Sequence, residues 1–209
     1  MWQKYKALWL QKSFISNVII GLVLLTVSFF VSYYANSYTT AHVGNNVSDI
    51  ILDHLPIVDV HLIFSEGAIG FIIFLALVLL YHTNYIPFAL KSIAVFILVR
   101  SFFLILTHLG PPLHGIYIDP TDYISRLSSG DDLFFSAHTG LPFLMAFIFW
   151  DKKLWRYIFF ISSFIGGAAV LLGHLHYSID VFSALFISFG IYHICQNIFK
   201  KDFNLILQN

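Results

Sequence analysis

Two histidines and an aspartate stand close together in an otherwise apolar part of the chain. Residues 171–180 read LLGHLHYSID, which places His174, His176 and Asp180 within seven positions. On a helix, His176 and Asp180 would share one face about one turn, ~5.4 Å, apart. The aspartate could then accept the Nδ1 proton of His176 and leave Nε2 for proton transfer. The spacing predicts a general base with its orienting carboxylate.

A second polar cluster, SSGDDLFFSAHTG, contains His138. We expect His138 to lie one to two turns inside a helix that starts on the same side of the bundle as His176. Packing of the two helices would then bring the two imidazoles together, with His138 as the nucleophile. Ser136 is the main alternative nucleophile, but it is two residues from His138 and would point to another side of that helix.

Two other interpretations of these side chains stay open. A histidine inside a membrane helix can be a packing residue, although ionisable groups at membrane depth are mostly functional or paired. The cluster could also bind zinc, because histidine and aspartate are zinc ligands. His174 and His176 would diverge on a helix, so we predict a site with no metal and no cofactor.

The composition is that of an integral membrane protein. Of 209 residues, 58% are hydrophobic and 11% charged, whereas soluble domains carry roughly 25% charged residues. The eleven basic residues balance the eleven acidic residues, so the net charge does not indicate a nucleic-acid partner. The single cysteine, Cys195, excludes an intrachain disulfide and a cysteine-cluster metal site. We expect membrane lipids as partners, no nucleic acid and no obligate protein partner.

The chain contains six largely apolar segments of the length that crosses a ~30 Å hydrocarbon core as a helix. We therefore predict an all-α, polytopic membrane protein in which residues 1–209 form a single domain, one bundle of six transmembrane helices. The predicted spans are residues 13–35, 65–81, 86–109, 133–150, 154–173 and 176–199.

The distribution of lysine and arginine predicts the orientation of this bundle. Basic clusters precede the first span, separate the fourth from the fifth, and follow the sixth, all on one side of a six-span chain. They are Lys4, Lys6, Lys12, Lys152, Lys153, Arg156, Lys200 and Lys201. Both termini are predicted to be cytoplasmic, with the active site on the exoplasmic face, which is periplasmic in a bacterium and lumenal in a eukaryote.

Two further cations lie within the third predicted span. A guanidinium in lipid needs an anionic partner, so we expect Arg100 to bind either a substrate phosphate or a buried acid such as Glu66. Lys91 lies nearer the cytoplasmic end, and we expect its amine to reach the membrane surface along an extended side chain.

The two polar clusters together resemble the sphingomyelin synthase family, a branch of the type 2 phosphatidic acid phosphatase superfamily of lipid phosphatases and phosphotransferases. The resemblance covers about residues 86–199 and rests on three blocks. In register with them are Arg100, Thr107, Leu109, Pro111 and Pro112, then Asp132, Ser136, His138 and Thr139, then His176, Tyr177, Ser178, Asp180 and Val181.

This resemblance implies six spans and a catalytic triad on the exoplasmic face, which would be His138, His176 and Asp180. We expect the substrate-binding residues to be Arg100, Asp132, Ser136, Thr139 and Tyr177. The chain departs from the pattern at Ala137 and Asp131, and the family has glycine at both positions.

A further departure bears on the substrate. The phosphatase relatives have an arginine six residues before the histidine of the last block, and here that residue is Val170. A phosphate monoester carries nearly two negative charges and usually needs several cations. With about one cation, this site suits a phosphodiester such as a phospholipid headgroup.

The sequence therefore predicts a membrane-embedded lipid phosphotransferase. It would move a phosphoryl headgroup of the phosphocholine or phosphoethanolamine type between lipids through a phosphohistidine intermediate. A lipid phosphate phosphatase that uses water as the acceptor is the alternative, and a non-catalytic transporter or scaffold is the second alternative.

Overall fold

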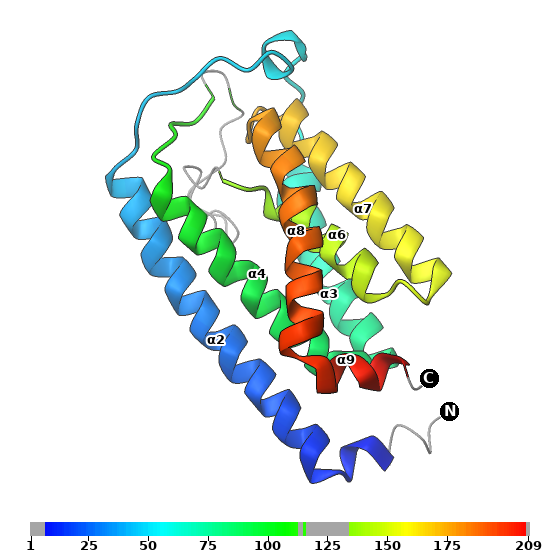
Figure 1. Ribbon diagram of the computed structural model, residues 1–209. Coiled ribbons are helices and arrows are strands. Elements are labelled where there is room, and N and C mark those ends of the chain that lie inside the picture. Colours follow the sequence, from blue (N-terminus) through cyan, green and yellow to red (C-terminus); the bar gives the residue numbers. More distant parts are fainter. Residues whose placement is uncertain (1–6, 113–114, 116–133, 208–209) are drawn as a thin grey trace.

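The computed structural model describes residues 7–112, 115 and 134–207, and within these ranges the regular elements are all helical. Figure 1 shows them as one elongated bundle. In chain order they are α2 (Lys12–Ala41), η1 (Leu52–His54), η2 (Leu62–Glu66), α3 (Gly67–Tyr81), η3 (Thr83–Tyr85), α4 (Ile86–Leu106), α6 (Ala137–Ile148), α7 (Lys153–Leu172), α8 (Ser178–Ile198) and α9 (Lys200–Leu207).

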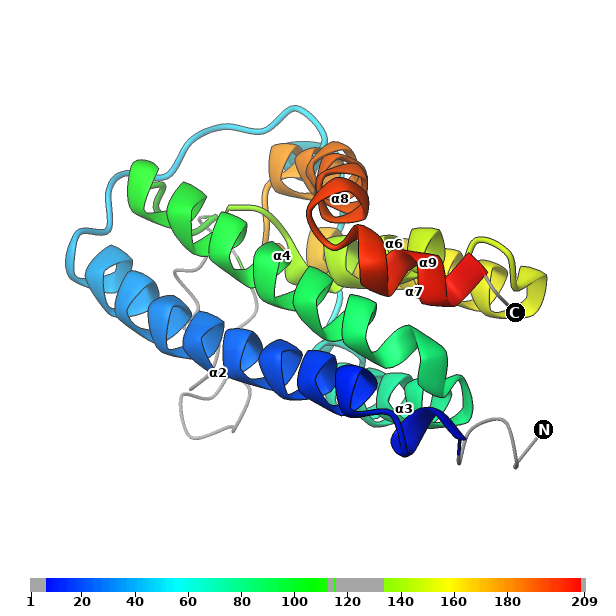
Figure 2. The same ribbon diagram turned by 60° about the horizontal axis from the view of Figure 1, so that its bottom comes forward.

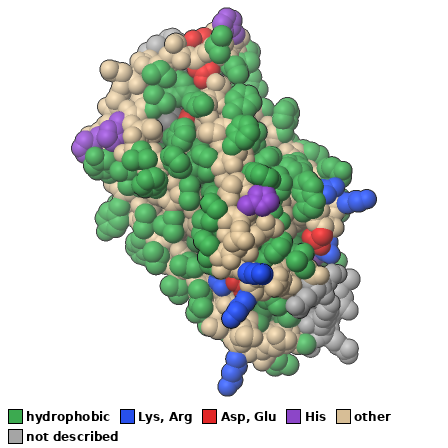
Figure 3. Space-filling model, viewed as in Figure 1, with side chains coloured by type: hydrophobic (Ala, Val, Ile, Leu, Met, Phe, Trp, Pro, Cys, Tyr) green, Lys and Arg blue, Asp and Glu red, His purple; other side chains and the backbone are tan. Residues whose placement is uncertain are grey.

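Five of these helical segments are long and apolar enough to cross a membrane. They are Lys12–Ala41, Leu62–Tyr81, Thr83–Leu106, Lys153–Leu172 and Ser178–Ile198. Their outward-facing side chains are largely hydrophobic, as the space-filling view shows (Figure 3). A soluble bundle would instead place charged and polar residues on its outer faces. These features confirm the predicted all-α, multi-pass membrane architecture.

The fourth predicted span, residues 133–150, contains a much shorter helix. α6 has 12 residues, or about 18 Å of helix, which is little more than half of a ~30 Å hydrocarbon core. Its N-cap, Ser136, has an extended backbone, so the apolar residues before it do not continue the helix. α6 packs against α7 and α8 in the interior of the bundle. A sixth membrane crossing stays a prediction.

The helices form two groups that meet along the length of the bundle. α2 lies beside α4 in both ribbon views (Figure 1, Figure 2), and α6, α7 and α8 pack together on the other side of α4. α2 begins and α9 ends at the same end of the bundle (Figure 1). Which side of the membrane that end faces stays a prediction.

Glycines let α6 approach its neighbours very closely. A Cβ added at Gly166 of α7 would lie 2.3 Å from the carbonyl oxygen of His138, and one at Gly140 would lie 2.8 Å from the Phe96 ring. Ser163 Oγ also donates to the carbonyl of Thr139 at 2.7 Å. Small residues at such contacts permit backbone-to-backbone packing in membrane proteins. They fix the position of the first turn of α6.

Lys91 does not reach the surface of the bundle as the sequence suggested. It is buried, and its Nζ lies 2.5 Å from Asp202 Oδ2 of α9 and 3.3 Å from Asn17 Oδ1 of α2. An ammonium removed from solvent needs such an anionic partner. This buried pair therefore joins α2, α4 and α9 at the end of the bundle where the chain finishes.

We predict that Gly166→Ala destabilises the protein, because the new methyl group must push α7 away from the His138 carbonyl. Overpacking of this kind destabilises by about 1–3 kcal/mol. Gly190→Ala in α8 is the matched control, since a Cβ there meets nothing within 4 Å and alanine is the better helix former. Thermal unfolding in detergent should show a lower midpoint for Gly166→Ala only. Equal midpoints would contradict the close packing.

Lys91→Met should also destabilise the fold, because it leaves the Asp202 carboxylate buried beside an apolar side chain. Breaking a buried ion pair by removing one partner destabilises by about 3–5 kcal/mol. The double variant Lys91→Met/Asp202→Leu should recover most of the loss. Lys201 is exposed, so Lys201→Met is expected to stay within about 0.5 kcal/mol of the parent. A Lys91→Met protein as stable as Lys201→Met would show that the pair does not join the helices.

Candidate active site

The His176–Asp180 pair forms in the structure, but not on the face of a helix. α8 begins at Ser178 with Tyr177 as its N-cap, so the predicted helix start at residue 176 was wrong by two positions. Asp180 is buried in the first turn of α8, and its Oδ2 accepts the backbone N–H of Tyr177 at 2.9 Å. The same Oδ2 lies 3.3 Å from His176 Nδ1. A helix-capping carboxylate thus also orients the imidazole.

The backbone of Asp180 reaches the second cluster. Its carbonyl oxygen accepts the N–H of Ser136 at 3.1 Å. Ser136 is the N-cap of α6 and His138 is the second residue of that helix. His138 is close enough to both His176 and Arg100 to interact with them electrostatically. The structure therefore gathers these side chains at the adjoining N-terminal ends of α6 and α8.

Arg100 lies on α4 and is buried beside the start of α6. Its Nε donates to the carbonyl oxygen of Phe135 at 2.8 Å. Glu66, one of its two expected partners, is instead exposed and lies 3.8 Å from His61. The Arg100–Glu66 pair was therefore a wrong alternative, because Glu66 points out of the bundle. A phosphate partner for Arg100 stays a prediction.

The imidazole of His138 contacts the π-helical turn η2. Its Nε2 lies 3.1 Å from the carbonyl oxygen of Phe64, and the Phe64 ring stacks on it at a centroid distance of 4.3 Å. A carbonyl oxygen can only accept, so Nε2 carries the proton in this contact and a neutral His138 has its lone pair on Nδ1. π-Helical turns are rare and occur often at functional sites. No sequence pattern identified Phe64 among many apolar residues.

Three of the expected substrate-binding residues make internal contacts. Ser136 and Thr139 are buried and joined by a hydrogen bond of 3.3 Å from Thr139 Oγ1 to Ser136 Oγ. Tyr177 is 1% exposed, and its hydroxyl donates to the Gly110 carbonyl at 2.9 Å and accepts from Val47 N–H at 3.2 Å. These contacts hold the site together. A role in substrate binding stays a prediction, and Asp132 lies outside the described residues.

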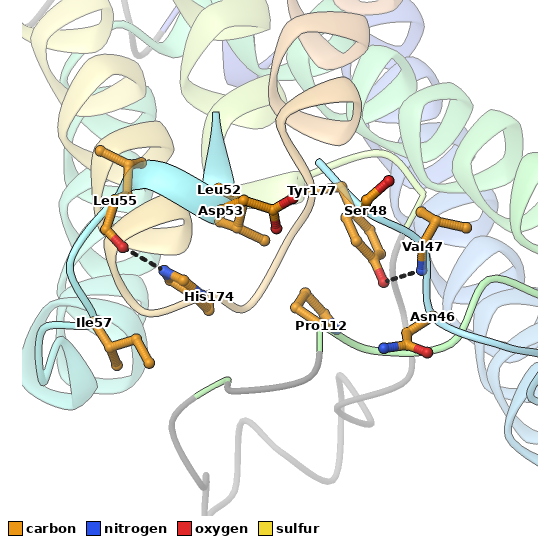
Figure 4. Close-up of a pocket in the computed structure, with 10 residues that line it drawn as sticks. All are labelled: Asn46, Val47, Ser48, Leu52, Asp53, Leu55, Ile57, Pro112, His174 and Tyr177. Atoms are coloured by element: carbon orange, nitrogen blue, oxygen red, sulfur yellow. Dashed lines mark hydrogen bonds between the residues drawn. The ribbon is translucent and has the colours of Figure 1, made fainter. Parts of the chain in front are cut away.

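A cavity of about 710 Å³ opens beside the turn that carries His176. Figure 4 shows that it is bounded by the loop between α2 and α3, by Pro112 and by the residues that flank His176. His174 and Tyr177 line it, whereas the three predicted catalytic residues do not. The described lining residues are Asn46, Val47, Ser48, Leu52, Asp53, Leu55, Ile57, Pro112, His174 and Tyr177. The cavity therefore adjoins the turn that carries His176, but it does not contain the predicted catalytic side chains.

His174 contacts the loop between α2 and α3. Its Nε2 lies 3.2 Å from the Leu55 carbonyl, and its backbone has the left-handed φ of 52°. This conformation, which is uncommon for a residue other than glycine, lets the chain reverse between α7 and α8. Within the described ranges, no three His, Cys, Asp or Glu side chains gather as a metal site would require.

Asp49, in the loop between α2 and α3, contacts the start of α8, and the sequence did not reveal this contact. Its carboxylate is buried and accepts the N–H of Ser178 at 2.6 Å, so it contacts the first residue of α8. The loop contains other aspartates, and nothing in their spacing singles out one that contacts a helix 129 positions later.

Comparison with known proteins gives a match over the part of the chain that contains these side chains. Residues 130–197 match the family model described as PAP2 superfamily C-terminal, and this stretch contains His138, His176 and Asp180. No curated protein matches the chain. The match supports the type 2 phosphatidic acid phosphatase superfamily without singling out its sphingomyelin synthase-like branch. Residues 130–197 of this membrane protein are therefore similar to the C-terminal region of a superfamily of lipid phosphatases and phosphotransferases.

Proposed function

We propose that this protein is a membrane-embedded lipid phosphotransferase in which His138, His176 and Asp180 form the catalytic triad. The observation that carries the proposal is the double role of Asp180. Its carboxylate contacts His176, and its carbonyl holds the start of α6, two residues before His138. A nucleophile, a proton carrier and the group that orients the carrier are the three parts that such catalysis needs.

In the first step, the lone pair of His138 attacks the phosphorus of the donor lipid. A P–N bond forms, and the P–O bond to the diacylglycerol-type alcohol breaks. The imidazolium of His176 gives its proton to the departing oxygen, and the Asp180 carboxylate stabilises that imidazolium until then. The headgroup phosphate is now covalently attached to His138.

In the second step, the hydroxyl of an acceptor lipid takes the position of the departed alcohol. Neutral His176 accepts the hydroxyl proton, the oxygen attacks phosphorus, and the P–N bond breaks. His138 and protonated His176 are regenerated. Two steps let one site serve two bulky lipids in succession, which suits a site that lies among transmembrane helices.

The charges around the site favour a zwitterionic phospholipid as the donor. Arg100 and the N-terminal amides of α6 can stabilise a phosphodiester with one negative charge. Beside the turn that carries His176, the exposed carboxylate of Asp53 lines the cavity, and residues 13–90 contain no Lys or Arg. A carboxylate in the cavity next to the proposed phosphate site favours a headgroup that carries an ammonium, of the phosphocholine or phosphoethanolamine type.

Hydrolysis is the second candidate function, because the matched superfamily includes phosphatases as well as phosphotransferases. The same triad would act with water as the acceptor in the second step. The donor would then be a lipid phosphate, and inorganic phosphate would be the product.

The two functions differ in where the phosphorus goes. We predict that purified protein in lipid nanodiscs moves label from headgroup-labelled phosphatidylcholine or phosphatidylethanolamine onto added diacylglycerol or ceramide. Parallel incubation with labelled phosphatidate should release little inorganic phosphate. Rapid phosphate release without transfer would assign the protein as a phosphatase, and neither activity would contradict both candidates.

Side-chain replacements test the triad. His138→Ala should abolish turnover, and Asp180→Asn should lower kcat roughly 10²–10⁴-fold, the range typical of general acid–base catalysis. His193→Ala is the matched control, because His193 is an exposed histidine of α8 outside the triad. It should leave kcat unchanged. Thermal midpoints for all variants separate lost chemistry from lost folding. A fully active His138→Ala protein would rule out this triad.

A further inference from the structure

A buried carboxylate of the loop between α2 and α3, that of Asp49, contacts the turn that carries His176. Asp49 Oδ1 accepts the backbone N–H groups of Ile51 and Leu52, each at 3.0 Å. Asp49 Oδ2 accepts the N–H of Ser178 at 2.6 Å. One oxygen thus shapes the loop in which Asp49 lies, while the other binds the first residue of α8.

This second bond lies beside the catalytic turn. Ser178 is two residues after His176, and Asp180 accepts the neighbouring N–H, that of Tyr177. Two carboxylates from distant parts of the chain therefore bind consecutive N–H groups at the positive end of α8. Such groups have no partner within the helix, so external acceptors determine how the first turn is held.

Asp49 is ionised under ordinary conditions. Burial would raise its pKa, but hydrogen bonds from the N–H groups of Leu52, Ser178 and Ile51 and from the Ser178 side chain outweigh burial and hold the pKa below its usual value. A charged acceptor makes a stronger hydrogen bond than a neutral one. The bond to Ser178 is therefore maintained at neutral pH.

Neighbouring contacts reinforce the same attachment. The Tyr177 hydroxyl bonds the N–H of Val47, two positions before Asp49, and the carbonyl of Gly110 after α4. The Leu55 carbonyl contacts His174 on the other side of His176. The turn between α7 and α8 is thus held by the loop at positions that flank His176.

We propose that Asp49 is a positioning residue for His176, acting through its hydrogen bond to Ser178 N–H. This inference rests on the proposed function, in which His176 is the proton carrier. A misplacement of about 1 Å at a catalytic group can lower the rate roughly a hundredfold. The bond from Asp49 keeps the turn, and with it the His176 imidazole, in register with His138.

Two substitutions at Asp49 separate its two oxygens. Asparagine keeps a carbonyl oxygen for Ile51 and Leu52 and caps such turns well, but its amide nitrogen cannot accept from Ser178. Alanine removes both interactions. Asp49→Asn and Asp49→Ala should therefore both lower kcat roughly tenfold to a hundredfold, with KM within about twofold of the parent.

Ser178 allows the same bond to be removed from the other side. Proline is favourable at the first position of a helix, and it removes the N–H donor together with the Ser178 hydroxyl, which also bonds Asp49. Tyr177 already has the extended backbone, φ −73° and ψ 159°, that a residue before proline requires. Ser178→Pro should reproduce the Asp49→Asn loss, and the double variant should lose no more. Ser178→Ala removes only the hydroxyl and keeps the N–H, so it should stay active.

Asp59→Asn is the matched loop control. Asp59 is exposed and accepts a backbone N–H of its own loop, that of His61 at 3.0 Å. It should keep the parent kcat. If Asp49→Asn were fully active while Asp49→Ala was inactive, Asp49 would act only as a cap within its own loop. An equal loss in Asp59→Asn would assign the effect to loop charge. Either result would overturn the proposal.

Hydrogen exchange followed by mass spectrometry makes the test independent of turnover. Peptides covering residues 174–182 should exchange faster in Asp49→Asn than in the parent and in Asp59→Asn. If the parent protein lacked all lipid activity, the proposed function would fail while faster exchange still supported the attachment. Unchanged exchange in Asp49→Asn would overturn the positioning role, whatever the activity of the parent.

Discussion

The arrangement of the site depends on the buried carboxylate and carbonyl of Asp180. Burying a carboxylate inside a membrane protein costs free energy, and such a residue is retained where polar partners offset that cost. Here the partners are the N–H of Tyr177 and the imidazole of His176, and the carbonyl of the same residue holds Ser136. One residue thus caps α8, orients the proposed proton carrier and positions the helix that bears the proposed nucleophile.

The rest of the bundle maintains this junction. Gly166 lets α7 contact the backbone at His138, Arg100 holds the carbonyl of Phe135, and the Phe64 ring covers the His138 imidazole. Each contact comes from a different helical segment. Because α6 is short and enclosed by α7 and α8, its first turn is determined by these neighbours more than by its own length. That is the preorganisation that phosphoryl transfer by positioned side chains requires.

The sequence predicted the features that depend on local patterns. Apolar run lengths located the long helices to within a few residues for α4, α7 and α8, and the four-residue spacing of His176 and Asp180 anticipated their contact. The length of α6 was overestimated, because the apolar residues before Ser136 are not helical. The pairs Lys91–Asp202 and Asp49–Ser178 join residues 111 and 129 positions apart. No periodicity in the chain encodes such contacts, which are fixed only when helices pack.

The most direct test of the proposed mechanism is to trap the covalent intermediate. Protein incubated with headgroup-labelled phospholipid, without acceptor, would be quenched at alkaline pH, where phosphohistidine is stable, and digested for mass spectrometry. The mechanism predicts an acid-labile phosphoryl group on His138, which disappears when an acceptor lipid is added and is absent from His138→Ala. Label on another residue, or steady turnover with no label on His138, would contradict nucleophilic catalysis by this histidine.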